Sequence, residues 1–160
     1  MKRIFALVPV LAMSLAASGV LLAQDNSFFG TWKLNVAKSK FVGTQAPQSE
    51  TRTLEPQGNG EKVTYEGIAA DGSRISYTFN SNFDGKDSPI SGSNQPFGAD
   101  TIAVTRVDAN TITAISKKGG KTLVTTRSVL SKDGKTTTNT SKGINAQGQL
   151  VNQVLVWERQ

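Results

Sequence analysis

The sequence of 160 residues contains neither cysteine nor histidine. Without cysteine, no disulfide can brace the fold, so burial and hydrogen bonding must hold it together. Without histidine, Ser-His-Asp and Cys-His nucleophiles cannot be built. Zinc loses its usual ligands and haem its usual histidine ligand. We therefore predict a protein that is not an enzyme, with no cofactor and no metal site.

Carboxylates are few, and several of them are explained by turns. Asp71, Asp84, Asp108 and Asp133 stand where turn geometry favours aspartate. Asp84 and Asp87 resemble a fragment of a calcium loop, but the EF-hand spacing and its terminal glutamate are missing. A glycosidase-type pair among the twelve acidic residues stays open, because carboxyl groups far apart in sequence can meet in space. The sequence points to no particular pair.

Long runs of one charge are also missing. The net charge is +6, and the densest basic cluster is Lys117, Lys118 and Lys121. A nucleic-acid-binding domain would show a basic stripe with interleaved aromatic residues, so we expect no nucleic-acid partner. Mild, dispersed basicity suits solubility and weak attraction to anionic surfaces.

The N-terminus has the layout of a secretory signal peptide. Lys2 and Arg3 precede an uncharged, mostly apolar run from residue 4 to residue 23. Cleavage is expected after Ala23, with Ser18 as the alternative. An uncleaved membrane anchor is the other interpretation, since about 20 apolar residues can span a bilayer. We predict a signal peptide over residues 1–23, one domain over residues 24–160, and a periplasmic or extracellular protein without a stable membrane anchor.

Most of the chain after residue 26 alternates with period two between turn residues. The clearest hairpin joins residues 62–69 to residues 74–79 through Asp71-Gly72. Residues 35–41 are predicted to form one helical turn capped by Asn35, and residues 91–100 a rim loop. Short strands with sequential turns predict an all-β, antiparallel up-and-down β-barrel of eight to ten strands. The strands are too polar for an outer-membrane barrel.

Both ends of the chain resemble a known family. Phe28-Phe29-Gly30-Thr31-Trp32-Lys33-Leu34 resembles the opening strand of the calycins, which include lipocalins and intracellular fatty-acid-binding proteins, and residues 154–160 resemble the end of the latter. The "GTWKLN…KSKF" start also resembles a set of small secreted bacterial proteins. The resemblance implies a lipocalin-like barrel. The Arg-x-Tyr pair that holds a fatty-acid carboxylate in that family would fall at Leu155 and Trp157, so that tether is missing.

The same resemblance gives the chain ends a structural role. In an up-and-down barrel the last strand pairs with the first. Gly30, Trp32 and Arg159 are then the residues of barrel closure, with the Arg159 guanidinium over the Trp32 ring. Such a contact contributes roughly 0.5–2 kcal/mol.

Residues that would line the interior are the candidates for ligand binding. Arg106 shares a strand face with Ile102 and Val104, and an inward guanidinium would clamp an anion. Arg127 shares a face with Leu123, but apolar residues flank both arginines on the opposite face, so which face points inward stays open. The candidate ligand-binding residues are Tyr65, Tyr77, Phe79, Ile102, Val104, Arg106, Leu123, Arg127 and Trp157, with Ile75 and Val129 beside them.

Three functions fit these observations. The leading one is a secreted or periplasmic barrel that binds a small, partly apolar molecule, with an anionic group as an option. The second is a packed barrel without a cavity that acts as an interaction or stress module of the cell envelope. The third is a lipocalin-like enzyme that uses carboxylates and tyrosines inside the barrel.

Overall fold

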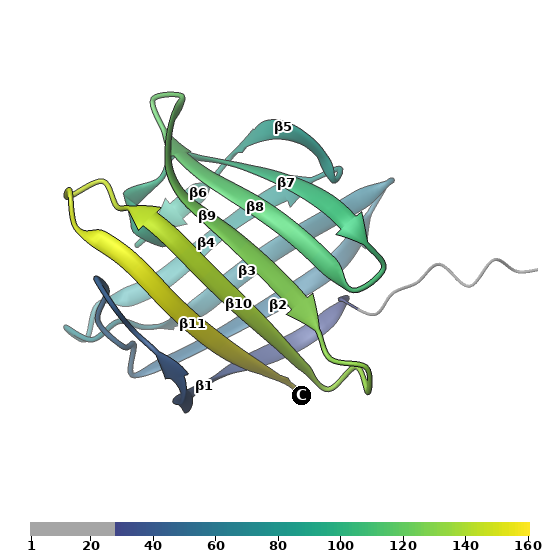
Figure 1. Cartoon of the computed structure of the whole chain (residues 1–160), viewed down its shortest axis with the longest axis horizontal. Coiled ribbons are helices and arrows are strands. Elements are labelled where there is room, and N and C mark those ends of the chain that lie inside the picture. Colours follow the sequence, from purple (N-terminus) through teal and green to yellow (C-terminus); the bar gives the residue numbers. More distant parts are fainter. Residues whose placement is uncertain (1–27) are drawn as a thin grey trace, which may run out of the picture.

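The computed structural model describes residues 28–160, and the predicted signal peptide lies outside them (Figure 1). The fold class is confirmed, with eleven strands in place of the eight to ten expected: these residues form antiparallel strands with almost no helix. The strands are β1 (Gly30–Lys40), β2 (Ser49–Gln57), β3 (Gly60–Ile68), β4 (Arg74–Ser81), β5 (Asp84–Pro89), β6 (Ser91–Ser93), β7 (Thr101–Asp108), β8 (Thr111–Lys118), β9 (Lys121–Leu130), β10 (Thr136–Ile144) and β11 (Leu150–Arg159), with a 3-10 turn, η1, at Pro96–Gly98.

All strands belong to one sheet with the order β5-β7-β8-β9-β10-β11-β1-β2-β3-β4-β6. Its two edge strands, β5 and β6, are consecutive in the chain and are separated only by Ile90. The segment from residue 84 to residue 93 pairs first with β7 and then with β4. The sheet is thus a nearly closed barrel, and the change of partner at Ile90 divides one crossing of the wall into two short strands.

The connections between strands lie at the two ends of the barrel. Strands β8–β11 lie in front in Figure 1, and β2–β4 lie behind them. Because neighbouring strands are antiparallel, alternate connections share an end. We call one end the mouth, which carries the segments 41–48, 69–73, 94–100, 119–120 and 145–149. The other is the plugged end, which carries the segments 58–59, 82–83, 109–110 and 131–135 with residues 28–29 and 160.

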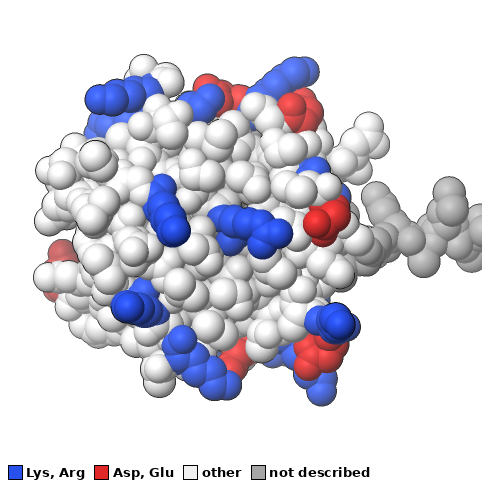
Figure 2. Space-filling view, viewed as in Figure 1, with Lys and Arg blue, Asp and Glu red and all other residues white. Residues whose placement is uncertain are grey.

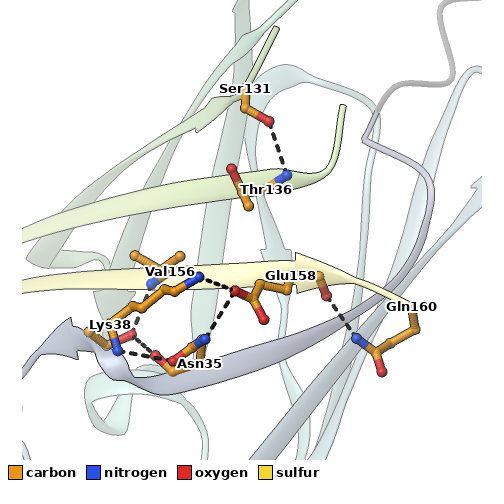
Figure 3. A network of polar contacts seen from close by, with 8 residues as sticks. Asn35, Lys38, Ser131, Thr136, Val156, Glu158 and Gln160 are labelled. Atoms are coloured by element: carbon orange, nitrogen blue, oxygen red, sulfur yellow. Dashed lines mark hydrogen bonds and ion pairs between the residues drawn. The ribbon is translucent and has the colours of Figure 1, made fainter. Parts of the chain in front are cut away.

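The predicted helical turn over residues 35–41 is wrong, because β1 runs on to Lys40. The β1–β11 register shifts between Asn35 and Lys40, which bulges β1 outward. Asn35 Oδ1 accepts a hydrogen bond from the Lys38 backbone N–H, as a helix cap would, but the strand then resumes. Figure 3 shows why: Asn35 Nδ2 and Lys38 Nζ both donate to Glu158 Oε1 on β11, at 3.0 and 2.8 Å. Tertiary pairing with β11 overrides the local signal for a turn.

The plugged end is closed by the residues expected there. Trp32 pairs with Arg159 across β1 and β11, and the Arg159 guanidinium carbon lies 4.2 Å from the centroid of the Trp32 ring. Arg159 also donates to the carbonyls of Phe29 and Gly134. A Cβ on Gly30 would lie 2.8 Å from Arg159 Nη1, and the φ of Gly30 is +122°, so this position favours glycine.

The charged side chains of the outer surface are dispersed. Figure 2 shows Lys and Arg side chains dispersed over the face formed by the front strands, with Asp and Glu toward its margins. Within residues 28–160, no helix is long and apolar enough to span a membrane.

We predict that Trp32→Ala lowers the free energy of unfolding by about 3–5 kcal/mol, because it removes a fully buried ring from the plug. Denaturant unfolding monitored by circular dichroism measures this. Val107→Ala, at a side chain that is 59% exposed, is the matched control and should change stability little. A loss below about 1 kcal/mol for Trp32→Ala would show that the ring does not hold the end closed.

Candidate functional site

A cavity of about 590 Å³ lies inside the barrel. It begins at the mouth, where residues of four connections border it, and reaches Phe28 and Ile112 toward the plugged end. The predicted rim loop, residues 91–100, contributes residues 94–98 to this border. A space of this size lies within the range of small-molecule sites.

Six of the nine candidate ligand-binding residues line this cavity, as does Ile75. Tyr65 and Tyr77 stack with ring centroids 4.6 Å apart, and Tyr65 meets Trp157 edge to face at 5.8 Å. Their hydroxyl groups are buried, which raises the pKa of both tyrosines. The six residues are Tyr65, Tyr77, Phe79, Ile102, Val104 and Trp157.

The remaining three, Arg106, Leu123 and Arg127, lie outside the lining. Thr126 and Ser128 border the cavity, so the alternation of β9 turns Arg127 to the exposed surface. Leu123 packs only partly buried against the hydrophobic core and Val129 is half-buried; neither borders the cavity.

Arg106 does follow Ile102 and Val104 on the inner face of β7, but it lies near the plugged end. Its guanidinium carbon lies 4.5 Å from the centroid of the Phe83 ring and 5.7 Å from that of Phe28. The side chain therefore packs on aromatic rings rather than facing a ligand.

The arginine that lines the cavity is instead Arg52 on β2. It is 4% exposed, and its guanidinium carbon lies 4.7 Å from the centroid of the Trp157 ring and 5.8 Å from that of Trp32. Arg52 Nη2 donates to the Thr137 hydroxyl. Among residues 28–160, Arg52 Nε has no hydrogen-bond partner. A buried guanidinium with a free N–H is a donor available to a ligand.

Sequence reasoning passed over Arg52 because its place beside Trp32 depends on the register between β1 and β2. Arg52 lies directly opposite Trp32 on β1 and Tyr65 on β3. The β1–β2 connection is long, so no tight turn fixes the pairing of Arg52 with Trp32 in advance. The available signal was the alternation of Glu50, Arg52 and Leu54, which puts all three on the face that Leu54 buries.

Two carboxyl groups accompany Arg52 along the lining, Glu50 and Glu61. Burial raises the pKa of each from 4.5 to about 7, and the Arg52 charge offsets part of this rise. Glu61 is 3% exposed, and its Oε2 has no partner among the described residues. Near neutral pH each group is therefore close to half protonated, so each can donate or accept a hydrogen bond.

Strands β9 and β10 give the lining a polar side that sequence reasoning also missed. Thr126 and Ser128 on β9 and Asn139 and Ser141 on β10 all border the cavity. The Thr126 and Ser141 hydroxyl oxygens lie 2.8 Å apart. The signal was present in the sequence: from Thr136 to Gly143, β10 has no apolar side chain on either face, so a polar row had to enter the barrel.

Fold and interior together define an antiparallel β-barrel with an internal cavity. No family model matches the chain, and no curated protein matches it. Among solved structures, the chain is similar to the zebrafish ileal bile acid-binding protein crystallised with cholic acid, with a TM-score of 0.49. The two are 14% identical over 84% of this chain and 99% of that chain.

We predict that the barrel becomes more stable as the pH falls from 8 to 5. The pKa of Glu61 is about 7 in the folded state against 4.5 for the free group, so the folded protein holds this proton more tightly. The resulting stabilisation is complete below pH 4.5 and lost as pH rises through 7, about 3 kcal/mol for this group.

Glu61→Gln should flatten this pH dependence, because it removes one of the two titrating groups. Urea unfolding between pH 5 and pH 8 measures the slope. Glu55→Gln, at an exposed position on β2, is the control and should keep the wild-type slope. Equal slopes for Glu61→Gln and the wild type would contradict the raised pKa.

Proposed function

We propose that this protein binds a small, partly apolar molecule inside its barrel and does not transform it. The observation that carries this proposal is the cavity of about 590 Å³, lined by stacked aromatic rings and by one buried guanidinium. A barrel filled with side chains, as the packed envelope module requires, would leave no space of this kind.

The chemistry of the lining supports an amphipathic ligand. The rings of Tyr65, Tyr77 and Trp157 and the aliphatic side chains beside them favour hydrocarbon surface. Arg52 offers a charged donor that favours an oxygen or an anionic group of the ligand. An apolar body with one acidic or polar group satisfies both features.

The arrangement of carboxyl groups supports binding without catalysis. Glu50 pairs with Gly67 and Pro56 pairs with Glu61, so the two acidic residues lie six positions apart along β2. At about 3.3 Å per residue this is roughly 20 Å, whereas glycosidase carboxyl pairs lie roughly 5–9.5 Å apart. The most perturbed carboxyl groups of the cavity therefore do not form such a pair.

We further propose export to the periplasm or the cell exterior, on the strength of the charged and then apolar N-terminal segment. In that setting the barrel would carry or sequester its ligand outside the cytoplasm, with no nucleic-acid partner. N-terminal sequencing of the protein from its own cells tests this: export predicts a mature N-terminus after Ser18 or Ala23, and an intact Met1 would contradict it.

Native mass spectrometry of protein purified from its own cells, followed by solvent extraction, tests the binding function directly. A reproducible bound mass of a small molecule, one per chain, is expected. Repeated absence of any adduct, together with failure to bind the fluorophore 8-anilinonaphthalene-1-sulfonate, would contradict the binding function.

We predict that the anionic fluorophore 8-anilinonaphthalene-1-sulfonate binds one site per folded chain and that Ala114→Trp weakens this binding at least about tenfold. Ala114 borders the cavity, so an indole there occupies ligand volume. Val107→Trp adds the same group to an exposed side chain and should leave the affinity unchanged. Circular dichroism and thermal melting establish that both variants are folded. Equal affinity in both variants would place the probe outside the cavity.

A further inference from the structure

The cavity has two chemically different sides. Strands β3 and β4, in the rear layer of Figure 1, present an apolar and aromatic row: Val63, Tyr65, Ile75, Tyr77 and Phe79. In the front layer, the lining residues of β9 and β10 are all uncharged and polar, and Ser116 on β8 and Gln153 on β11 extend this row, whereas the other lining residues of β8 and β11 are apolar or aromatic (Ile112, Ala114, Leu155 and Trp157). The polar row is Ser116, Thr126, Ser128, Asn139, Ser141 and Gln153. The polar row crosses four neighbouring strands and is not confined to one end of the cavity.

This polar row retains hydrogen-bonding capacity. Asn139 is 7% exposed, and within the described part of the chain its Oδ1 has no hydrogen-bond partner. Ser141 is buried, and its hydroxyl group contacts that of Thr126. Covering such groups with hydrocarbon is unfavourable, because a buried polar group left unpaired loses its hydrogen bonds to water.

A fatty acid, with a single polar group at one end, leaves this row facing methylene groups. A ligand with hydroxyl or carbonyl groups along one side pairs the row while its other side covers Tyr77 and its neighbours. Such pairing discriminates strongly, because a site built to hydrogen-bond a group rejects the analogue that lacks it.

We propose that the barrel selects an oxygenated lipid: an amphiphile with hydroxyl or carbonyl groups along one side, between its two ends, and a hydrocarbon surface on the other. The polar row of β8–β11 binds the oxygen atoms, and the apolar row of β3 and β4 covers the hydrocarbon. This inference rests on the proposed binding function and specifies the class of ligand.

A matched pair of probes tests the proposal: 9,10-dihydroxyoctadecanoate and octadecanoate have the same chain length and the same carboxylate. Each is titrated below its critical micelle concentration against the barrel loaded with 8-anilinonaphthalene-1-sulfonate. The dihydroxy acid should displace the fluorophore at a concentration at least about tenfold lower. Octadecanoate binding as tightly or more tightly would overturn the proposal and leave the binding function standing. Displacement by neither acid, with no adduct from the native protein, would overturn both.

Variants of the polar row then test whether its side chains cause the preference for the dihydroxy acid. Asn139→Leu should reduce the ratio between the two affinities at least about fivefold, chiefly by weakening the dihydroxy acid. Should that variant fail to fold, the double variant Thr126→Val with Ser128→Ala removes two hydroxyl groups of the same row at nearly constant volume. Thr138→Val, a half-buried position beside Asn139 with the opposite orientation on β10, is the control and should keep the ratio. An unchanged ratio in the folded row variants would overturn the proposal.

Discussion

A row of alternating cations and rings runs across five strands, and the rest of the barrel depends on it. Arg159, Trp32, Arg52, Tyr65 and Tyr77 are successive cross-strand partners on β11, β1, β2, β3 and β4. The strands on either side of β1 each bring a guanidinium group to the Trp32 ring, and the two tyrosines stack at the far end of the row. Because one slip in register turns every side chain of a strand to the other face, these contacts fix the register of all five strands together.

The same row connects the plug to the cavity. Trp32 is completely buried in the plug, while Arg52, its partner on β2, borders the cavity. Burying a guanidinium carries a large desolvation cost, and the Trp32 and Trp157 rings and the Thr137 hydroxyl offset part of it. Closure of the barrel thus positions the guanidinium group that borders the cavity, so the pairing of the first and last strands also shapes the interior.

The sequence predicted the features that local patterns encode. Alternation and Asp-Gly turns predicted the antiparallel barrel, and the chain ends predicted the contact between Trp32 and Arg159, which the structure contains. The helical turn predicted over residues 35–41 is wrong because Glu158, distant in sequence, binds Asn35 and Lys38 within β1. Arg52 was missed because its place follows from a register set across a long connection. Alternation within β9 did not show which face of that strand points into the barrel. The pairing of the whole sheet determines this, and Arg127 lies on the outer face.

The polar side of the interior bears on stability as well as binding. A barrel selected only to fold would fill its inner face with apolar side chains, as β4 does with Ile75 and Phe79. Strand β10 instead buries Thr137, Asn139 and Ser141, which contribute little hydrophobic stabilisation and need hydrogen-bond partners. A ligand that forms hydrogen bonds with these groups would also stabilise the folded state by mass action. The composition of β10 is therefore explained better by the proposed ligand than by the folding of the barrel alone.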